Sequence, residues 1–506
     1  MKILHAIFSR TAFVIVTAVV ELLLLVSIFL WFREQAVWIE SILRVLSLII
    51  VLTIIRWSRH LSSDLMWILL IILFPVAGTA IYILVGADLL GSRTTRNLLK
   101  SEQAGMKYLK QDPEVLEELQ KEAPDLAGQF RYISESAGYP FSRNTGFDYY
   151  GLGDDGYPVM LEEMRKAEKF IFLEYFIIEE GQMWNGMLEI LEEKAKQGLD
   201  IRVLYDDLGS FSTLSSHYAD QLEAKGIKCI PFNRVNPILN IVLNHRDHRK
   251  IMVIDGKTAF SGGVNLADEY INAVVKHGHW KDTVIRVKGE AVWTFTVMFL
   301  SHWNAFRNED PDYTVFKAEA QPGEHDGYIA PYGDSPFVPD KIAQDIYVGM
   351  LNRANKYCYI ETPYLIVDTD MINSLILAAK QGVDVRIITP GVPDKRIVWE
   401  ITRSYYRQLL EGGVKIYEYT PGFIHAKVFA ADDRMASVGT VNLDYRSLYL
   451  HFENSTFIYG SKRVIDIRDD FLATLEQCRQ IRKESLKPSP VRDFLIGIVR
   501  LFAPML

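Results

Sequence analysis

Apolar positions are most concentrated near the N-terminus, where three long runs occupy residues 11–32, 41–57 and 65–86. The run at 65–86 is uncharged and about as long as a helix that crosses the hydrocarbon core of a bilayer. The run at 11–32 carries Glu21 near its centre, but its apolar residues outweigh the cost of inserting one carboxylate. The middle run has an arginine near each end and fits either a short span or an interfacial helix. The pattern predicts an anchor of two or three transmembrane helices over residues 1–90.

Beyond this anchor the pattern becomes that of a soluble α/β protein. Residues 91–130 are polar and charged, and we expect them to form a connector. After residue 130, short apolar runs rich in β-branched residues alternate with stretches of helical periodicity, which is typical of α/β units around a buried sheet. Each unit is expected to run strand, helix, strand, helix, strand.

These units occur twice along the chain. The strand Phe170-Ile-Phe-Leu-Glu-Tyr-Phe176 corresponds to Tyr357-Cys-Tyr-Ile-Glu-Thr-Pro-Tyr364, and the helices and strands that follow repeat in the same order. We place the first half at residues 131–330 and the second half at residues 331–487. The predicted fold is therefore a duplicated α/β architecture.

A sharper repeat lies inside the two halves. The first copy is His248-x-Lys250-x4-Asp255 followed by Gly262-Gly-Val-Asn265, and the second is His425-x-Lys427-x4-Asp432 followed by Gly439-Thr-Val-Asn442. Alternate side chains of a strand share a face, so each histidine is expected beside its lysine. Displacement at phosphorus needs a nucleophile, a general acid and cations for the phosphate oxygens, and one half supplies only part of this set. Both copies are therefore predicted to line one shared active site.

Composition narrows the chemistry. The chain has 506 residues and a formal charge of −8, which predicts at least two domains and argues against nucleic acid as a partner. Its three cysteines are too widely spaced for a disulfide or metal framework. The histidines of the first half lack the spacing of a helical metal site, and the second half has no matching cluster. No metal or other cofactor is predicted.

The doubled motif resembles that of the phospholipase D superfamily, and finer features resemble the bacterial cardiolipin synthases within it. These features are Pro75-x-x-Gly78-x-x-x-Tyr82, the Glu-Tyr-Phe and Glu-Thr-Pro-Tyr strands, and Asn442-Leu-Asp-Tyr-Arg-Ser447 followed by Phe452-Glu453-Asn454. The resemblance covers essentially the whole chain. It implies two tandem phospholipase D-like α/β/α sandwich halves that form one shared active site after N-terminal transmembrane helices. Thr440 stands where a serine is common, and the extra run at 41–57 leaves the number of spans open.

The resemblance also implies a reaction. One histidine attacks the phosphorus of phosphatidylglycerol and expels glycerol, and a second phosphatidylglycerol resolves the phosphatidyl-histidine to give cardiolipin. His248 is expected as the nucleophile and His425 as the acid and base, an assignment that the sequence leaves open. The resemblance gives the remaining residues two roles: Lys250, Lys427, Asn265 and Asn442 hold phosphate oxygens, while Asp255, Asp432 and Glu453 support the histidines.

Other readings of the same residues are open at this point. Water in place of the second lipid would make the protein a membrane-bound phospholipase D hydrolase, and another alcohol would make it a different phosphatidyltransferase. A non-catalytic membrane scaffold would predict decay of one motif, and both are intact. The sequence does not indicate an oligomeric state.

The charge distribution bears on location. Five basic residues follow the last apolar run, which favours a multi-pass protein of the cell membrane with its catalytic domain on the cytoplasmic side. Residues 488–506 have apolar side chains at helical spacing beside two arginines. They are expected to form an amphipathic tail that lies in the membrane interface or packs on the protein.

Overall fold

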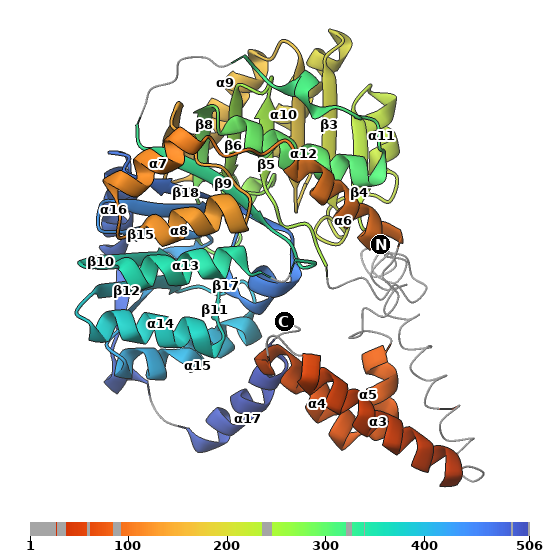
Figure 1. Cartoon of the computed structure of the whole chain (residues 1–506), viewed down its shortest axis with the longest axis vertical. Helices are drawn as coiled ribbons and strands as arrows, with labels where there is room; N and C mark the ends of the chain where they lie inside the picture. The colour runs from red at the N-terminus through yellow and green to blue at the C-terminus, as the bar shows by residue number, and fades with distance from the viewer. Residues whose placement is uncertain are drawn as a thin grey trace.

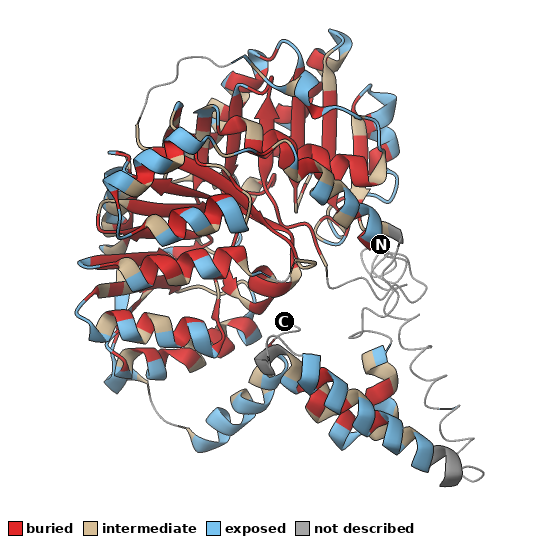
Figure 2. Cartoon of the chain, in the orientation of Figure 1, coloured by how far each residue is buried: buried red, intermediate tan, exposed pale blue. Residues whose placement is uncertain are grey.

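Two mixed sheets form the framework of the protein (Figure 1). The structure is a computed structural model that describes residue 27 and residues 37–57, 61–83, 93–234, 245–319, 326–338, 340–486 and 489–503. The two sheets confirm the predicted pair of tandem α/β halves. Most strands of both sheets are buried along their whole length (Figure 2), as expected for sheets that helices cover on both faces.

The first sheet has seven strands in the order β1-β8-β6-β5-β2-β3-β4. Their bounds are β1 Thr145–Tyr150, β2 Phe170–Tyr175, β3 Asp200–Asp206, β4 Lys228–Phe232, β5 Ile251–Ile254, β6 Thr258–Gly262 and β8 Val284–Gly289. Strands β2, β3 and β4 are parallel and the remaining pairs are antiparallel. Helices of this half are α9 Gly153–Arg165, α10 Gln182–Lys196, α11 Tyr218–Ala224 and α12 Val292–Phe306.

The second sheet has eight strands in the order β19-β13-β12-β10-β15-β16-β18-β9. Their bounds are β9 Tyr328–Asp334, β10 Tyr357–Glu361, β12 Asp384–Pro390, β13 Lys415–Tyr419, β15 Val428–Ala431, β16 Met435–Gly439, β18 Glu453–Tyr459 and β19 Cys478–Ile481. Helices of this half are α13 Ile342–Arg353, α14 Thr369–Lys380, α15 Arg396–Glu411 and α16 Val464–Leu475. Strands β10, β12 and β13 are parallel, like β2, β3 and β4 of the first sheet.

Two small parallel pairings complete the framework. Strand β7, His279–Lys281 of the first half, pairs with β14, Gly422–Ile424 of the second half. Strand β11, Leu365–Ile366, pairs with β17, Leu443–Asp444, within the second half. A parallel bridge between Asp247 and Phe452 makes another connection between the halves. The halves are therefore joined by backbone hydrogen bonds as well as by side-chain packing.

The predicted connector is helical. Its elements are α6 Arg93–Met106, α7 Pro113–Glu122, α8 Ala127–Arg131 and a π-helix at Tyr132–Ser136. Asp112 caps α7 by accepting a hydrogen bond from the backbone N–H of Glu114, and Pro113 occupies the first turn, where no intrahelical N–H is needed. Helix α6 packs along α12 of the first half, so this part of the connector is integrated with the first half.

The N-terminal part differs from its prediction. It contains α3 Val37–Trp57, α4 Leu61–Leu73 and α5 Pro75–Ile81. In the described part of the run at 65–86, the one continuous helix that was expected is two helices that meet at Pro75, which lacks the N–H needed to continue α4. Gly78 allows the close packing of α5 on α4: a Cβ there would lie 2.4 Å from the Leu70 carbonyl oxygen.

Among the described residues, no helix is both long enough and apolar enough to cross a membrane. The span predicted over residues 11–32 lies outside the described residues, apart from Ser27. Helices α3 and α4 expose large apolar side chains, including Val45, Leu52 and Ile72 (Figure 2).

The C-terminal tail forms α17, Pro490–Leu501, which packs beside α15. Arg492 pairs with Glu400, and the guanidinium of Arg500 lies 4.0 Å from the centre of the Tyr405 ring. Val491 and Phe494 on the other side of the helix are 72% and 70% exposed. The helix therefore turns its arginines to the protein and its apolar stripe outward.

Candidate active site

The two motif histidines lie in equivalent places. His248 and His425 are in extended segments that lead directly into β5 and β15. Each lysine lies on the same side as its histidine: Lys250 Nζ donates to the His248 carbonyl at 2.7 Å, and Lys427 Nζ lies 2.8 Å from His425 Nδ1. The strand spacing of the motif thus has the predicted effect on both histidine–lysine pairs.

Each histidine takes its carboxylate partner from the opposite half. Glu453 of β18 accepts a hydrogen bond from His248 Nδ1 at 2.9 Å, and Asp282 after β7 accepts one from His425 Nδ1 at 2.6 Å. The backbone follows the same exchange, because the His248 N–H donates to Phe452 and the His425 N–H donates to Lys281. Neither half could orient its own histidine in this way.

Asp282 was not among the residues expected from sequence. The available signal was weak: an acidic residue follows the Gly-x-x-Asn turn in each half, Asp282 after Asn265 and Glu453 after Asn442. The distances between these residues along the chain differ, so a motif search based on fixed spacing misses the correspondence.

Both histidines line one cavity of ≈ 550 Å³. Asn265 and Asn442 line it as well, whereas the lysines lie just beneath, each 1% exposed. Asn265 donates to the Tyr270 hydroxyl at 2.7 Å and accepts from a backbone N–H. The Asn442 amide oxygen is buried and has no hydrogen-bond partner among the described residues. The cavity therefore has polar groups from both halves.

Asp255 and Asp432 lie away from the cavity. The Asp255 carboxylate accepts hydrogen bonds from the N–H groups of residues 168–170, and Asp432 does the same for residues 355–357. Each aspartate follows its histidine along the strand and lies at the opposite end of it. A strand rises about 3.3 Å per residue, so the two side chains are well separated. They fix the start of β2 and β10, and among the described residues neither carboxylate is hydrogen-bonded to a motif histidine.

Comparison with known proteins identifies the family. A family model described as "Cardiolipin synthase, PLD-like domain" matches residues 160–303 and 347–475, more than half of the chain. A second model, "Phospholipase_D-nuclease N-terminal", matches residues 45–86. The chain belongs to the cardiolipin synthase family of phospholipase D-like proteins. This confirms the resemblance inferred from the two motifs.

Relatives in this family match nearly end to end. A protein of Halalkalibacterium halodurans named cardiolipin synthase is 36% identical, over 89% of this chain and 90% of its own. An uncharacterized protein of Streptococcus mutans is 44% identical, over 90% of this chain and 99% of its own. The crystal structure of phosphatidylserine synthase from Haemophilus influenzae has the same fold, with a TM-score of 0.55, 15% identity and coverage of 71% of this chain and 94% of that one.

Burial sets the protonation of the family's motif residues. Burial, followed by the charge of Lys250, lowers the pKa of His248 well below its ordinary value. Burial, followed by the charge of Lys427, lowers the pKa of His425 to about 4. The pKa of Lys250 is lowered by burial to about 7 and that of Lys427 to about 8, while burial raises the pKa of Glu453 well above its ordinary value. Both imidazoles are therefore neutral at neutral pH when the cavity holds no anion.

A second buried charge cluster lies behind His248 and was missed from sequence. His302 Nδ1 lies 2.8 Å from Glu174, and Arg249 lies 3.1 Å from His302 Nε2. Burial raises the pKa of Glu174 to about 7, and the neighbouring Asp247 raises it too. Asp247 precedes His248 and accepts the backbone N–H of Arg249. The cluster therefore holds the segment that carries the catalytic motif.

Two groups of side chains in the described residues have donor atoms within 4.8 Å of one another, as a metal site requires. They are His248, His451 and Glu453 in the cavity, and Glu174, Asp247 and His302 behind it. In the first group the hydrogen bond between His248 and Glu453 uses the same atoms that a metal would take. In the second, the Arg249 cation already lies against His302. Both groups are therefore explained by hydrogen bonding and ion pairing.

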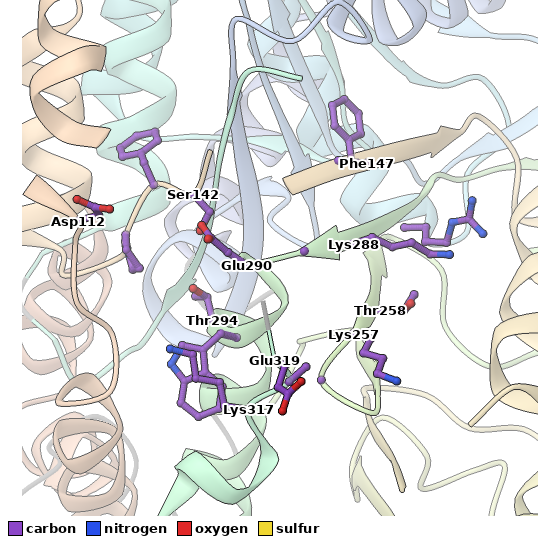
Figure 3. Close-up of a pocket in the computed structure, with 18 of the residues that line it drawn as sticks. Asp112, Ser142, Phe147, Lys257, Thr258, Lys288, Glu290, Thr294, Lys317 and Glu319 are labelled. Atoms are coloured by element: carbon purple, nitrogen blue, oxygen red, sulfur yellow. The ribbon is translucent and has the colours of Figure 1, made fainter. Parts of the chain in front are cut away.

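A larger cavity of ≈ 940 Å³ lies between the connector and the first half, and the motif histidines lie elsewhere. Figure 3 shows that it is lined by side chains of both signs, such as Lys257, Lys288, Glu290 and Glu319. A phosphodiester needs converging positive charge with a nucleophile beside it. The smaller cavity, with the two histidines, has these groups, and we take it as the active site.

Proposed function

We propose that the protein is a phosphatidyltransferase that joins two phosphatidylglycerol molecules into cardiolipin and releases glycerol. The observation that carries the proposal is the pair of histidines that line one cavity, each oriented by a carboxylate of the other half. Two imidazoles on one phosphorus provide the nucleophile and the acid that phosphatidyl transfer needs. Names of relatives such as the Halalkalibacterium halodurans protein support the same activity.

In the first step His248 Nε2 attacks the phosphorus of one lipid. The N–P bond forms as the P–O bond to glycerol breaks, and the departing oxygen takes the proton from His425 Nε2. Because the Nδ1 atom of His248 is hydrogen-bonded to Glu453, its Nε2 atom is the one directed to the substrate. Binding of the anionic phosphodiester favours the charged form of His425, which the empty cavity disfavours. The lipid thus brings about the protonation that its own cleavage requires.

In the second step a glycerol hydroxyl of another phosphatidylglycerol replaces the departed glycerol. His425 takes the proton of this hydroxyl, the new P–O bond forms, and the N–P bond to His248 breaks. Lys250, Lys427, Asn265 and Asn442 provide the positive charge and N–H donors for the non-bridging oxygens. His425 is protonated again when cardiolipin forms, gives up this proton to solvent when the product leaves, and regains one when the next lipid binds, so the cycle closes without cofactor or nucleotide.

The protein is further proposed to work on the surface of the membrane that holds its substrates. The exposed apolar side chains of α3 and α4 support this location, and so does the outward stripe of α17. Such surfaces are more stable against lipid than against water.

The proposal is tested by giving the purified full chain phosphatidylglycerol alone in detergent micelles and analysing the lipid products and glycerol. Cardiolipin and glycerol in equal amounts are expected. Phosphatidic acid and glycerol without cardiolipin would show that water resolves the intermediate, and would replace the synthase by a hydrolase.

A further inference from the structure

The wall of the catalytic cavity holds two N–H donors that the reaction above does not use. They belong to Trp280 and His451, and each side chain is buried, at 6% and 9% exposure. Trp280 Nε1 and His451 Nδ1 have no hydrogen-bond partner among the described residues. Both residues line the cavity. A buried donor without a partner destabilises the folded protein, so its presence at a binding site points to a partner that arrives with the substrate.

The two residues are equivalent in the duplicated fold. Trp280 precedes Asp282 by two positions, and His451 precedes Glu453 by two. The ring centre of Trp280 lies 5.7 Å from that of His425 at 44°, and the ring centre of His451 lies 5.7 Å from that of His248 at 43°. Each half therefore places one donor ring against the catalytic histidine of the other half.

The tautomer of His451 follows from its neighbour. Arg446 Nε donates to His451 Nε2 at 3.1 Å, and a guanidinium can only donate. Nε2 must therefore accept, and the proton of the neutral ring is on Nδ1. The nearest carboxylate oxygen, on Glu453, is 3.9 Å from this Nδ1, beyond hydrogen-bond range. His451, whose side chain lines the cavity, thus carries an N–H that has no acceptor among the described residues.

The surroundings of the two donors differ in charge. Arg446 lines the cavity beside His451, so an oxygen bound there meets a cation as well as an N–H. Trp280 stands among aromatic rings, with Tyr270 and Phe423 both at 4.9 Å between centres. A cationic wall suits an anionic oxygen, and aromatic faces with one donor suit an uncharged alcohol that carries C–H groups.

From this geometry we propose that Trp280 and His451 are substrate-binding residues with different ligands. His451 donates to the phosphodiester, whereas Trp280 donates to the glycerol hydroxyl of the leaving group and of the incoming lipid. The inference rests on the proposed function. It places the exchange of glycerol for lipid beside His425, and so makes His425 the residue that moves the proton.

The test uses Trp280→Phe and His451→Phe, which keep a ring and remove the donor. Trp293→Phe is the matched control, because the Trp293 N–H is bonded to a backbone carbonyl and lies at the other cavity. The purified full-length variants receive phosphatidylglycerol in detergent micelles, and the rates of cardiolipin and phosphatidic acid formation are measured together. Thermal midpoints of all variants check that each has folded.

Trp280→Phe is expected to lower the ratio of cardiolipin to phosphatidic acid roughly fivefold, because the incoming lipid loses a hydrogen bond that water does not need. His451→Phe is expected to lower kcat/KM for phosphatidylglycerol roughly tenfold and to leave the product ratio unchanged, since it weakens the phosphate contact of every reaction. His451→Asn, which keeps an N–H donor, should recover part of kcat/KM. Trp293→Phe should match the wild type in both.

Three outcomes would overturn the inference. Both ring variants could behave like Trp293→Phe, both could change the product ratio equally, or His451→Asn could be as impaired as His451→Phe. If the wild-type protein makes cardiolipin in any of these cases, the proposed function still holds. Wild-type protein that makes only phosphatidic acid overturns the proposed function first, and the assignment of Trp280 to an incoming lipid with it.

Discussion

Asp255 and Asp432 occupy equivalent positions in the two halves, and so do His451 and Trp280, but only the first pair is the same residue twice. The aspartates bind three backbone N–H groups each, a task that does not depend on the substrate. The second pair faces the cavity, where one side meets charge and the other meets aromatic rings. Duplication gave a symmetric framework, and the halves differ where an asymmetric reaction takes place.

Removal of either histidine should cause the largest loss of kcat, and the two variants should differ in whether the protein becomes labelled by substrate. His248→Ala and His425→Ala are each expected to reduce kcat by at least on the order of 10³-fold, because nucleophile and acid are both required. With phosphatidylglycerol radiolabelled in its phosphatidyl part, His425→Ala should acquire label on the protein slowly, because His248 can still attack without the acid, while His248→Ala should acquire none. Label on the His248→Ala protein instead would exchange the two roles.

Changes to the two acidic partners of the histidines should cause the second-largest loss of kcat. Glu453→Gln and Asp282→Asn keep the size of the side chain but cannot become the carboxylate that stabilises a charged imidazole, and each is expected to lower kcat by roughly 10²–10⁴-fold, as loss of the acid that orients a catalytic histidine does. Steady-state rates of both variants compare the two sides directly. A normal rate for either variant would mean that the opposite half does not orient that histidine.

The pKa values of the two lysines lead us to expect that KM for phosphatidylglycerol depends on pH. Their lowered pKa values, about 7 for Lys250 and about 8 for Lys427, mean that they are cations below these values and lose charge as pH rises through them. Phosphatidylglycerol should bind more weakly above pH 8, seen as a rise in KM while the protein stays folded. Because the pKa of His248 is lowered, the acid limb of kcat/KM should lie below pH 6.5. A KM that is constant to pH 9.5 would contradict the role of the lysines.

The smallest effect is expected at the aspartates, and on stability. Asp255→Asn and Asp432→Asn weaken charge-assisted bonds to backbone N–H groups and should each lower the free energy of unfolding by about 1–3 kcal/mol. Asparagine also tolerates the positive φ of these positions, 53° and 56°. Denaturant unfolding measures the change, with kcat as the control. A large loss of kcat in a folded variant would show that these aspartates contribute to catalysis.

Features that depend on the spacing of neighbouring residues could be predicted from the sequence. The repeated strands gave the two halves, and the alternation in His248-x-Lys250 put each lysine beside its histidine. Asp255 and Gly256 form the turn between β5 and β6. What Asp255 binds is the start of β2, far along the chain, and spacing alone could not give that contact.

Contacts between the halves were beyond sequence reasoning for the same reason. Glu453 was found because it follows a recognisable run of residues. The positions of Asp282 and Trp280 depend on the pairing of β7 with β14, and that of His451 on the bridge between Asp247 and Phe452. The run at 65–86 was expected as one helix, because proline is tolerated in membrane spans, but Pro75 separates α4 from α5.

The exchange of carboxylates between halves has a consequence for synthesis of the protein. Glu453 is 205 residues beyond His248, and Asp282 is 143 residues before His425. A ribosome that has released the first half has made a histidine with no partner, and contacts of such long range form late in folding. A growing or truncated chain therefore cannot attack the lipids around it, and activity begins only when nearly the whole polypeptide is present.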